Sequence, residues 1–132
     1  MKLLSICMMV KNEEKNLPRC LESLKPLMQQ VDSELIIVDT GSTDNTVNIA
    51  KSYTDRVYFH PWNNNFSEMR NITISYATGE WILILDADEE FVDFKEILIF
   101  LSRSDIRESY GACMVYVNSS LTPGKTENDV MF

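Results

Sequence analysis

The sequence predicts an α/β fold with three layers, in which helices cover both faces of a mostly parallel central sheet. Apolar runs of strand length at residues 3–10, 35–38 and 81–85 alternate with segments of helical period. The runs are nearly continuous in Ile, Val and Leu, as is typical of strands covered on both faces. With 132 residues the chain has the size of one domain, so we expect a single core.

The first helix is expected directly after the first strand. Four apolar residues share one helical face, at the spacing i, i+3, i+4, i+7: Leu17, Cys20, Leu21 and Leu24. Asn16 stands where an N-cap is expected, and Pro26 is expected to stop or kink the helix.

A second helix is expected to begin at Ser42 or Thr43 and to run through residues 44–53, because these residue types favour helix starts. The apolar and aromatic residues at 56–60 predict a strand after it.

A third helix is predicted at residues 67–77 and is expected to end at Gly79. One face of it carries Met69, Ile72, Thr73, Tyr76 and Ala77. Beyond the strand at 81–85, we expect a helix at 93–102, a strand at 111–118, and a loop at 122–129 that opens another element.

Composition excludes several classes of protein. The net charge of −8 and the pI near 4.6 would repel a phosphate backbone, so we expect no nucleic-acid partner. No segment approaches the ~20 apolar residues of a membrane span. Cys7, Cys20 and Cys113 lack paired spacing and indicate buried thiols of a reduced compartment. We therefore expect a cytoplasmic protein, free or peripheral at the inner face of the membrane.

Two carboxylates follow the third apolar run, in the stretch WILILDADEEF at residues 81–91. Side chains two apart in an extended segment share a side, so Asp86 and Asp88 are expected to point together, about 6.6 Å apart. Both would lie at the carboxyl end of a central strand, where open α/β sheets bind ligands. Their oxygens suit Mg²⁺ or Mn²⁺. The alternative is a solvated acidic turn that starts a helix.

Asp39 also ends an apolar strand, in the stretch VDTGSTDNT at residues 38–46. Turn and cap chemistry explains Gly41 to Thr46, but not Asp39, which has no basic neighbour in sequence. If its strand neighbours the strand that ends at Asp86, the two carboxylates would lie close together. Asp39 could accept a hydrogen bond from a nucleobase N–H or a ribose hydroxyl.

The stretch FSEMRN carries Arg70, which flanks the buried helical stripe and could reach the carboxyl edge of the sheet, although surface arginines are usually only solvated or paired. Trp62 and Phe66 could stack on a base, but packing into the core is the stronger expectation. His60, the single histidine, is expected to be structural.

Four blocks in this order resemble the inverting, nucleotide-sugar-dependent glycosyltransferases of the GT-A fold, of the family 2 type. They are SICMMVKNEEKNLPRCLESL, IIVDTGSTDNTVNIA, WNNNFSEMRN and ATGEWILILDADEEF, and they cover residues 3–91 almost continuously. The resemblance implies the Rossmann-like nucleotide-binding half of such an enzyme, with a nucleotide-diphosphate sugar, expected to be a UDP-sugar, as the donor.

The resemblance also implies roles for individual residues. Val10 and Asp39 would hold the nucleoside, and Arg70 would reach the base. Asp86 would contact the ribose or the metal shell, and Asp88 would bind a divalent cation, Mn²⁺ or Mg²⁺, that bridges the diphosphate. In the family an Asp or Glu well beyond the DxD deprotonates the acceptor.

No residue of this chain is assigned as that general base, since the chain ends at Phe132 and Glu89 and Glu90 are too close to the metal site. We expect residues 1–132 to be one nucleotide-sugar-binding glycosyltransferase domain, cut short after the DxD region. The acceptor stays open. The edge expected at residues 112–118 would invite pairing between chains, which predicts a homodimer.

Other functions remain as alternatives. The chain could be a nucleotide-sugar-binding module without catalysis. A haloacid-dehalogenase-type phosphatase also places DxD after a strand, but there it is the first strand. A sugar nucleotidyltransferase needs a Gly-rich loop after the first strand, where this chain has KNEEKN. A Rossmann dehydrogenase needs GxGxxG, which is missing.

Overall fold

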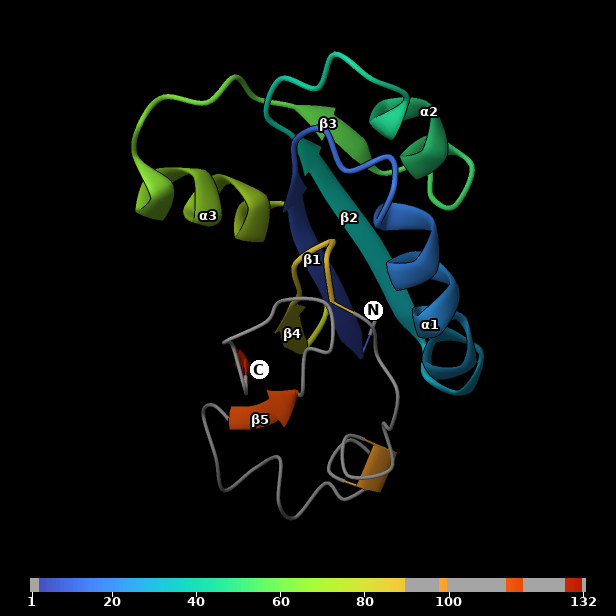
Figure 1. Cartoon of the computed structure of the whole chain (residues 1–132). Helices are drawn as coiled ribbons and strands as arrows, with labels where there is room; N and C mark the ends of the chain where they lie inside the picture. Colours follow the sequence, from blue (N-terminus) through green and yellow to red (C-terminus); the bar gives the residue numbers. More distant parts are fainter. Residues whose placement is uncertain (1–2, 90–97, 100–113, 118–127, 132) are drawn as a thin grey trace.

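Four parallel strands form the sheet of the protein, shown as a computed structural model in Figure 1. The structure describes residues 3–89, 98–99, 114–117 and 128–131. The strands are β1 (Leu4–Val10), β2 (Ser33–Asp39), β3 (Val57–Phe59) and β4 (Trp81–Ile84). They lie in the order β3-β2-β1-β4, so β1 is central and all four carboxyl ends meet at one edge.

Helices cover both faces of this sheet. The helices α1 (Leu17–Gln30) and α2 (Thr46–Lys51) lie on one face, and α3 (Phe66–Ser75) lies on the other, as Figure 1 shows. Each connection between consecutive strands of the sheet contains one helix, as parallel pairing requires. The predicted three-layer α/β/α architecture is confirmed.

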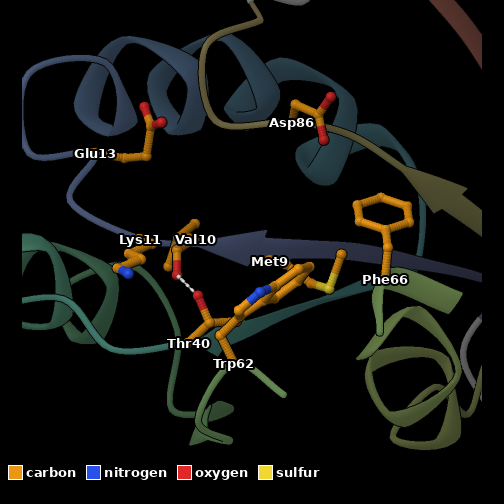
Figure 2. A pocket seen from close by; sticks show the side chains of 8 residues that line it. All are labelled: Met9, Val10, Lys11, Glu13, Thr40, Trp62, Phe66 and Asp86. Atoms are coloured by element: carbon orange, nitrogen blue, oxygen red, sulfur yellow. Dashed lines mark hydrogen bonds between the residues drawn. The ribbon is translucent and has the colours of Figure 1, made fainter. Parts of the chain in front are cut away.

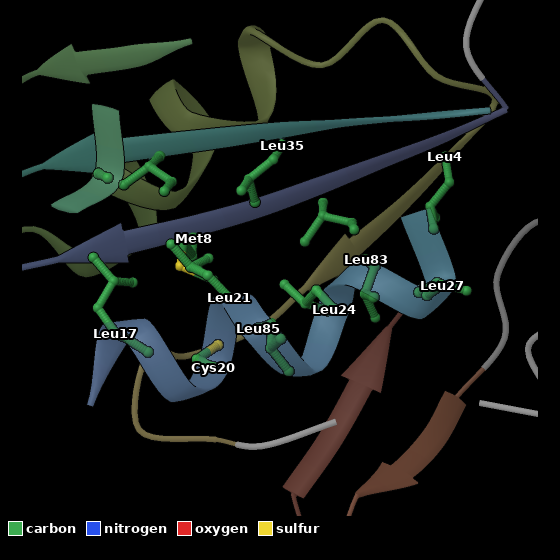
Figure 3. Close-up of a cluster of buried hydrophobic side chains, with 14 of the residues drawn as sticks. Leu4, Met8, Leu17, Cys20, Leu21, Leu24, Leu27, Leu35, Leu83 and Leu85 are labelled. Carbon is green, nitrogen blue, oxygen red and sulfur yellow. The ribbon is translucent and has the colours of Figure 1, made fainter. Parts of the chain in front are cut away.

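The main core lies between α1 and the sheet (Figure 3). Alternate strand residues meet the stripe on α1, and the cluster includes Leu4, Met8, Leu17, Cys20, Leu21, Leu24, Leu27, Leu35, Leu83 and Leu85. Burial of each such leucine contributes about 1.5–3 kcal/mol. The stripe predicted from sequence is therefore what fixes α1 to the sheet.

On the other face, a buried carboxylate joins several elements. Glu34 is 9% exposed and accepts hydrogen bonds from Ser5 Oγ at 2.6 Å, Thr78 N at 2.7 Å and Thr78 Oγ1 at 2.8 Å. Arg56 forms an ion pair with Glu34 and also donates from Nη2 to Tyr76 O at 2.8 Å. This Glu34 network ties β1, β2 and the entry to β3 to the segment that follows α3.

Two residues of the first helix, Pro26 and Asn16, behave only partly as predicted. Pro26 lies inside α1, which continues to Gln30, so of the two predicted effects, a stop or a kink, the stop does not occur. Five leucine and cysteine side chains of the helix are buried against the sheet. Their packing stabilises the helix although Pro26 lacks a backbone N–H and cannot make one intrahelical hydrogen bond. Asn16 occupies the N-cap position, but its side chain makes no capping hydrogen bond and donates instead to Glu13 Oε2 at 3.2 Å.

The second helix begins at Thr46, later than the predicted Ser42 or Thr43. Side chains explain the delay. Asp44 Oδ1 accepts from Thr46 N at 3.0 Å, and Asp39 accepts from Ser42 N, so these residues form a turn instead of a helical start.

The third helix ends at Ser75, before the predicted 77, and Gly79 does not end it. The amide of Gly79 donates to Ser5 Oγ at 2.8 Å. A Cβ at this position would lie 2.8 Å from Ser5 N and 2.9 Å from Leu4 C. The glycine is therefore required for close approach to β1.

The predicted strand at 111–118 is confirmed in its described part, but it belongs to a second sheet. β5 (Met114–Val117) pairs antiparallel with β6 (Asn128–Met131). Residues 98–99 of the predicted helix 93–102 are helical, and the rest of that helix and residues 122–127 of the predicted loop lie outside the described residues.

Cys7 and Cys20 are buried free thiols, as expected, and burial raises the pKa of each to about 12. Cys113 lies outside the described residues. Within the described part of the chain, we find no helix with the length and apolar character needed to cross a membrane.

Candidate functional site

A pocket of about 340 Å³ opens at the carboxyl edge of the sheet (Figure 2). The described residues that line it come from the ends of β1, β2 and β4 or just after them, from the segment before α3 and from the first residue of α3: Met9, Val10, Lys11, Glu13, Thr40, Trp62, Phe66 and Asp86. This is the edge at which open α/β sheets bind ligands.

The floor of the pocket is held by a hydrogen-bonded pair. Val10 O accepts from Thr40 N at 3.0 Å and from Thr40 Oγ1 at 3.2 Å, the latter drawn in Figure 2. The predicted site residue Val10 therefore lines the pocket while its carbonyl is already paired. What it offers a ligand is apolar surface.

Asp39 is buried, with 3% of its surface exposed, and its carboxylate caps the following turn. Gly41 N donates to Oδ2 at 3.2 Å, and Ser42 N lies 3.3 Å from Oδ1 and 3.2 Å from Oδ2. Since β1 lies between β2 and β4, Asp39 is not at a strand end adjacent to that of Asp86. The condition under which the two carboxylates would lie close together, that their strands are neighbours, is therefore not met.

Three carboxylates gather where β4 ends. One carboxylate oxygen from each of Asp86, Asp88 and Glu89 lies within 4.8 Å of the other two, with Asp86 exposed, Asp88 half-buried and Glu89 buried. Glu89 Oε1 accepts from Asp86 N at 3.1 Å, and Glu89 N donates to Asp86 O at 3.1 Å. The two predicted aspartates are thus brought together on a turn closed by Glu89.

The same turn contacts α1 through Cys20. The Cys20 thiol donates from Sγ to Asp86 O at 3.7 Å. Burial raises the pKa of this thiol to about 12, and the negative charges of Glu89, Asp88, Asp86 and Glu13 act in the same direction. The acidic cluster therefore makes the potential around the turn negative, which favours a cation there. Three hard oxygen donors fit Mg²⁺ or Mn²⁺.

Arg70 stands behind the aromatic wall of the pocket. Its guanidinium lies 4.9 Å from the centroid of the Phe66 ring, and Phe66 packs edge-on against Trp62 at 6.4 Å. Among the described residues, Arg70 Nε is buried without a hydrogen-bond partner, and Arg70 does not itself line the pocket.

The two aromatic residues do not close the core. Trp62 is 43% exposed and Phe66 is 56% exposed, because the segment from Pro61 to Glu68 lies at the surface. The expectation that they pack into the core is wrong, and they are available to a ligand in the pocket.

The model of one protein family, Glycosyl transferase family 2, matches residues 5–120, which is most of the chain. The chain belongs to glycosyl transferase family 2. The alternatives of a phosphatase, a nucleotidyltransferase and a dehydrogenase are not supported by this match.

Relatives of this family 2 chain include proteins named as glycosyltransferases. It is 49% identical over 92 residues to a TPR repeat-containing protein of Synechococcus elongatus, covering 70% of this chain and 22% of that protein. It is 43% identical over 81 residues to the prophage-derived glycosyltransferase SunS of Bacillus subtilis, covering 60% of this chain and 18% of SunS. A glycosyltransferase of Rickettsia typhi is 37% identical over 90 residues, covering 68% and 29%. The chain thus spans less than a third of each of these relatives.

Solved structures agree on the fold. Glucosyl-3-phosphoglycerate synthase from Mycobacterium tuberculosis, in complex with Mn²⁺ and UDP-glucose, matches with a TM-score of 0.57 and 26% identity. The match covers 68% of this chain and 34% of that one. S. aureus TarS matches in fold with a TM-score of 0.58 and 23% identity, over 76% of this chain and 32% of that one.

Several residues at this edge of the sheet are missed by sequence reasoning. Glu89 of the acidic cluster is one of them, although an acid three residues after Asp86 can accept a hydrogen bond from its N–H. Lys11, Glu13 and Thr40 follow the ends of β1 and β2, so the argument from strand ends could have found them. His60 is hydrogen-bonded through Nε2 to Tyr76 OH at 2.6 Å, a partner that the sequence alone does not indicate.

Proposed function

We propose that this chain binds the donor of a glycosyltransferase reaction, a nucleotide-diphosphate sugar with uridine as its nucleoside. One observation carries the proposal: the pocket at the carboxyl edge of the sheet is bordered by Asp86, whose carboxylate clusters with those of Asp88 and Glu89. Support comes from the family and from a relative in fold whose complex contains Mn²⁺ and UDP-glucose.

Asp86, Asp88 and Glu89 would hold the divalent cation, Mn²⁺ or Mg²⁺. A diphosphate oxygen and a carboxylate at ~4 Å repel by about 4 kcal/mol per charge pair when the effective dielectric constant is about 20. When bound, such a cation offsets this repulsion and neutralises the charge that develops on the departing nucleotide.

The nucleoside would occupy the other end of the pocket. Val10 would offer apolar contact, and Asp39 would accept from the base on the lone pairs left by its turn hydrogen bonds. Arg70 would reach the base from behind Phe66, since it does not line the pocket. Its buried Nε, which has no hydrogen-bond partner among the described residues, leaves a donor that such a contact would use.

Sugar transfer requires an acceptor and a general base, and neither is assigned to this chain. The domain of residues 1–132 would supply donor binding. The chain spans 18–29% of the relatives described above. A donor-binding module without catalysis is the second candidate, and turnover distinguishes it in the test below.

The test is calorimetric titration of UDP into the chain with Mn²⁺ and then with EDTA. We expect binding that requires the metal. Asp88→Asn should weaken it on the order of 10- to 100-fold, because it removes a charged ligand from the cluster. Asp39→Ala should weaken binding without removing its metal dependence.

Two further variants sharpen this test. Asp55→Asn makes the same chemical change at an exposed acid before β3 and should leave UDP binding unchanged. Glu89→Gln keeps an oxygen that can accept from Asp86 N but removes the charge, so it should weaken metal-dependent binding in a chain that stays folded. If neither EDTA nor Asp88→Asn changes UDP binding, the assignment of the metal site is wrong. Binding without turnover of UDP-glucose would favour the module.

A further inference from the structure

Two loops at the carboxyl edge of the sheet, residues 11–16 after β1 and residues 40–45 after β2, are joined by hydrogen bonds centred on Asn12. The backbone of Asn12 donates from N to Ser42 Oγ at 2.9 Å. Its side-chain Oδ1 accepts from Thr43 N at 2.8 Å and lies 3.4 Å from Thr43 Oγ1. One residue thus gives both a donor and an acceptor to the facing loop, and we name these contacts the Asn12 clamp.

The backbone of Asn12 has φ 53, in the left-handed region. Residues other than glycine are uncommon there, and asparagine and aspartate are the best tolerated of them. Asparagine therefore meets two needs at this position: a conformation that turns the chain back toward residues 42–43, and an oxygen that reaches Thr43 N.

Contacts next to the Asn12 clamp join the same two loops. Glu13 N donates to Thr46 Oγ1 at 2.8 Å, and Asn45 N donates to Glu14 Oε2 at 3.2 Å. Glu14 N approaches Asp44 Oδ2 at 3.4 Å. The stretches KNEE and STDNT are thus complementary in hydrogen bonding, and each loop limits the movement of the other.

The Asn12 clamp is linked to the pocket on both sides. Lys11 and Glu13, which flank Asn12, line the pocket. Ser42, which accepts from Asn12 N, donates its own N–H to the carboxylate of Asp39. Loss of the clamp would therefore free the pocket-lining residues of one loop and loosen the hydrogen bond that orients Asp39 on the other.

We propose that Asn12 is a positioning residue of the donor site, which joins the loops after β1 and β2 so that Asp39, Lys11 and Glu13 keep their places around a bound nucleoside diphosphate. This inference rests on the proposed function, since it assumes that UDP binds in this pocket. Asn12 itself is not among the described residues that line the pocket, so its effect on the ligand is indirect.

The experiment compares UDP binding, with Mn²⁺, by calorimetry in the chain and in two variants at the same position. Asn12→Gly permits the positive φ but removes the acceptor, and it should weaken UDP binding on the order of tenfold, equivalent to about 1.4 kcal/mol. Asn12→Asp keeps the acceptor and tolerates the backbone, so it should recover most of the affinity at physiological salt, where surface charges are screened.

Asn64→Gly is the matched control. Asn64 also has a positive φ, 63, but it is exposed and does not line the pocket. The variant removes the same side chain from the same backbone conformation and should bind UDP as the unmodified chain does.

A double-mutant cycle with Asp39→Ala tests whether the effect is indirect. If Asn12 acts on Asp39 through Thr43 and the adjoining Ser42, Asn12→Gly should cost clearly less in the Asp39→Ala background than alone. Full additivity, or equal UDP affinity of Asn12→Gly and the unmodified chain, would overturn the inference and leave the proposed function standing. A chain that is folded but does not bind UDP would overturn both.

Amide hydrogen exchange gives a readout that needs no ligand. The Thr43 amide should exchange faster in Asn12→Gly than in the unmodified chain and Asn12→Asp, because its acceptor is gone. Equal exchange in all three would contradict the Asn12 clamp itself.

Discussion

Gly79 brings the segment after α3 against β1 more closely than a residue with a side chain could. A methyl group in place of its hydrogen would lie 2.8 Å from the backbone N of Ser5 and 2.9 Å from the backbone C of Leu4. These atoms belong to the central strand and have little freedom to move. The requirement for glycine is therefore one of space, and it acts on the strand that carries Val10 at its other end.

We expect Gly79→Ala to lower the free energy of unfolding by about 1–3 kcal/mol, since overpacking of this size forces backbone shifts. Urea unfolding followed by circular dichroism measures it. Ser5→Ala added to this variant should not restore stability, because the contact with Ser5 N remains. A change below ~0.5 kcal/mol for Gly79→Ala would show that the segment can move away at little cost.

Single residues also show how far the sequence predicts the site. Asp86 and Asp88 can be identified because two acids directly after an apolar strand are conspicuous, and the structure brings them together. Glu89 is not predicted, because its position depends on a turn that brings its side chain back to Asp86 N. The sequence pattern does not show this turn. Trp62 and Phe66 are expected in the core because aromatic residues usually are buried, whereas here the loop before α3 and the first turn of α3, which carry them, are exposed.

At the scale of elements, α1 contains a proline where a helix normally has an N–H. Pro26 is exposed, removes one intrahelical hydrogen bond and yet does not end the helix, because the buried stripe on either side packs against the sheet.

Pro26→Ala should therefore stabilise the chain. Proline inside a helix costs about 3 kcal/mol relative to alanine, and part of this is offset because alanine leaves the unfolded chain with more freedom. We expect a net gain of about 1–2 kcal/mol in the free energy of unfolding, measured by urea denaturation. Gln29→Ala, at an exposed position of the same helix, is the control and should change stability by less than ~0.5 kcal/mol. A loss of stability in Pro26→Ala would mean that the native helix is built around the proline.

Element boundaries and strand order mark the limit of prediction at this scale. The strands are predicted well because continuous apolar runs identify buried parallel strands. The start of α2 is predicted too early because Ser, Thr and Asp favour both helix starts and loop turns, and here they form a turn that the Asp39 carboxylate caps. The position of β1 between β2 and β4 follows from pairing between distant segments, which no local pattern shows.

At the scale of the whole molecule, the Glu34 network connects the sheet to the segment after α3. Burial alone would raise the pKa of the Glu34 carboxyl, but the hydrogen bonds from Ser5 and Thr78 and the charge of Arg56 outweigh it, and the pKa is lowered from its ordinary value of 4.5. The folded protein therefore holds the Glu34 proton less tightly than the unfolded chain does.

The lowered pKa of Glu34 determines how stability depends on pH. The stabilisation from Glu34 is fully present above its unfolded pKa of 4.5 and is lost as the pH falls through the lower folded value. Glu34→Gln should be less stable than the unmodified chain at about pH 7, by about 2 kcal/mol, because it loses a charged acceptor of several hydrogen bonds.

The difference between the two proteins should shrink below about pH 4, where the native carboxylate takes up a proton. Urea unfolding of both proteins across this pH range measures the difference, and subtraction removes the titration of the other acids. A difference that is constant with pH would show that the Glu34 charge is not what stabilises the network.

The central position of β1 has one more consequence, which concerns size. Neighbouring strands are spaced by about 4.8 Å, so β2 and β4 run about 10 Å apart across β1. β1 therefore keeps the Asp39 turn and the acidic cluster at a fixed separation. Only a ligand of sufficient length can contact both. A free base or a free diphosphate would meet one end at a time, whereas a molecule long enough to carry both groups gains from the two ends at once.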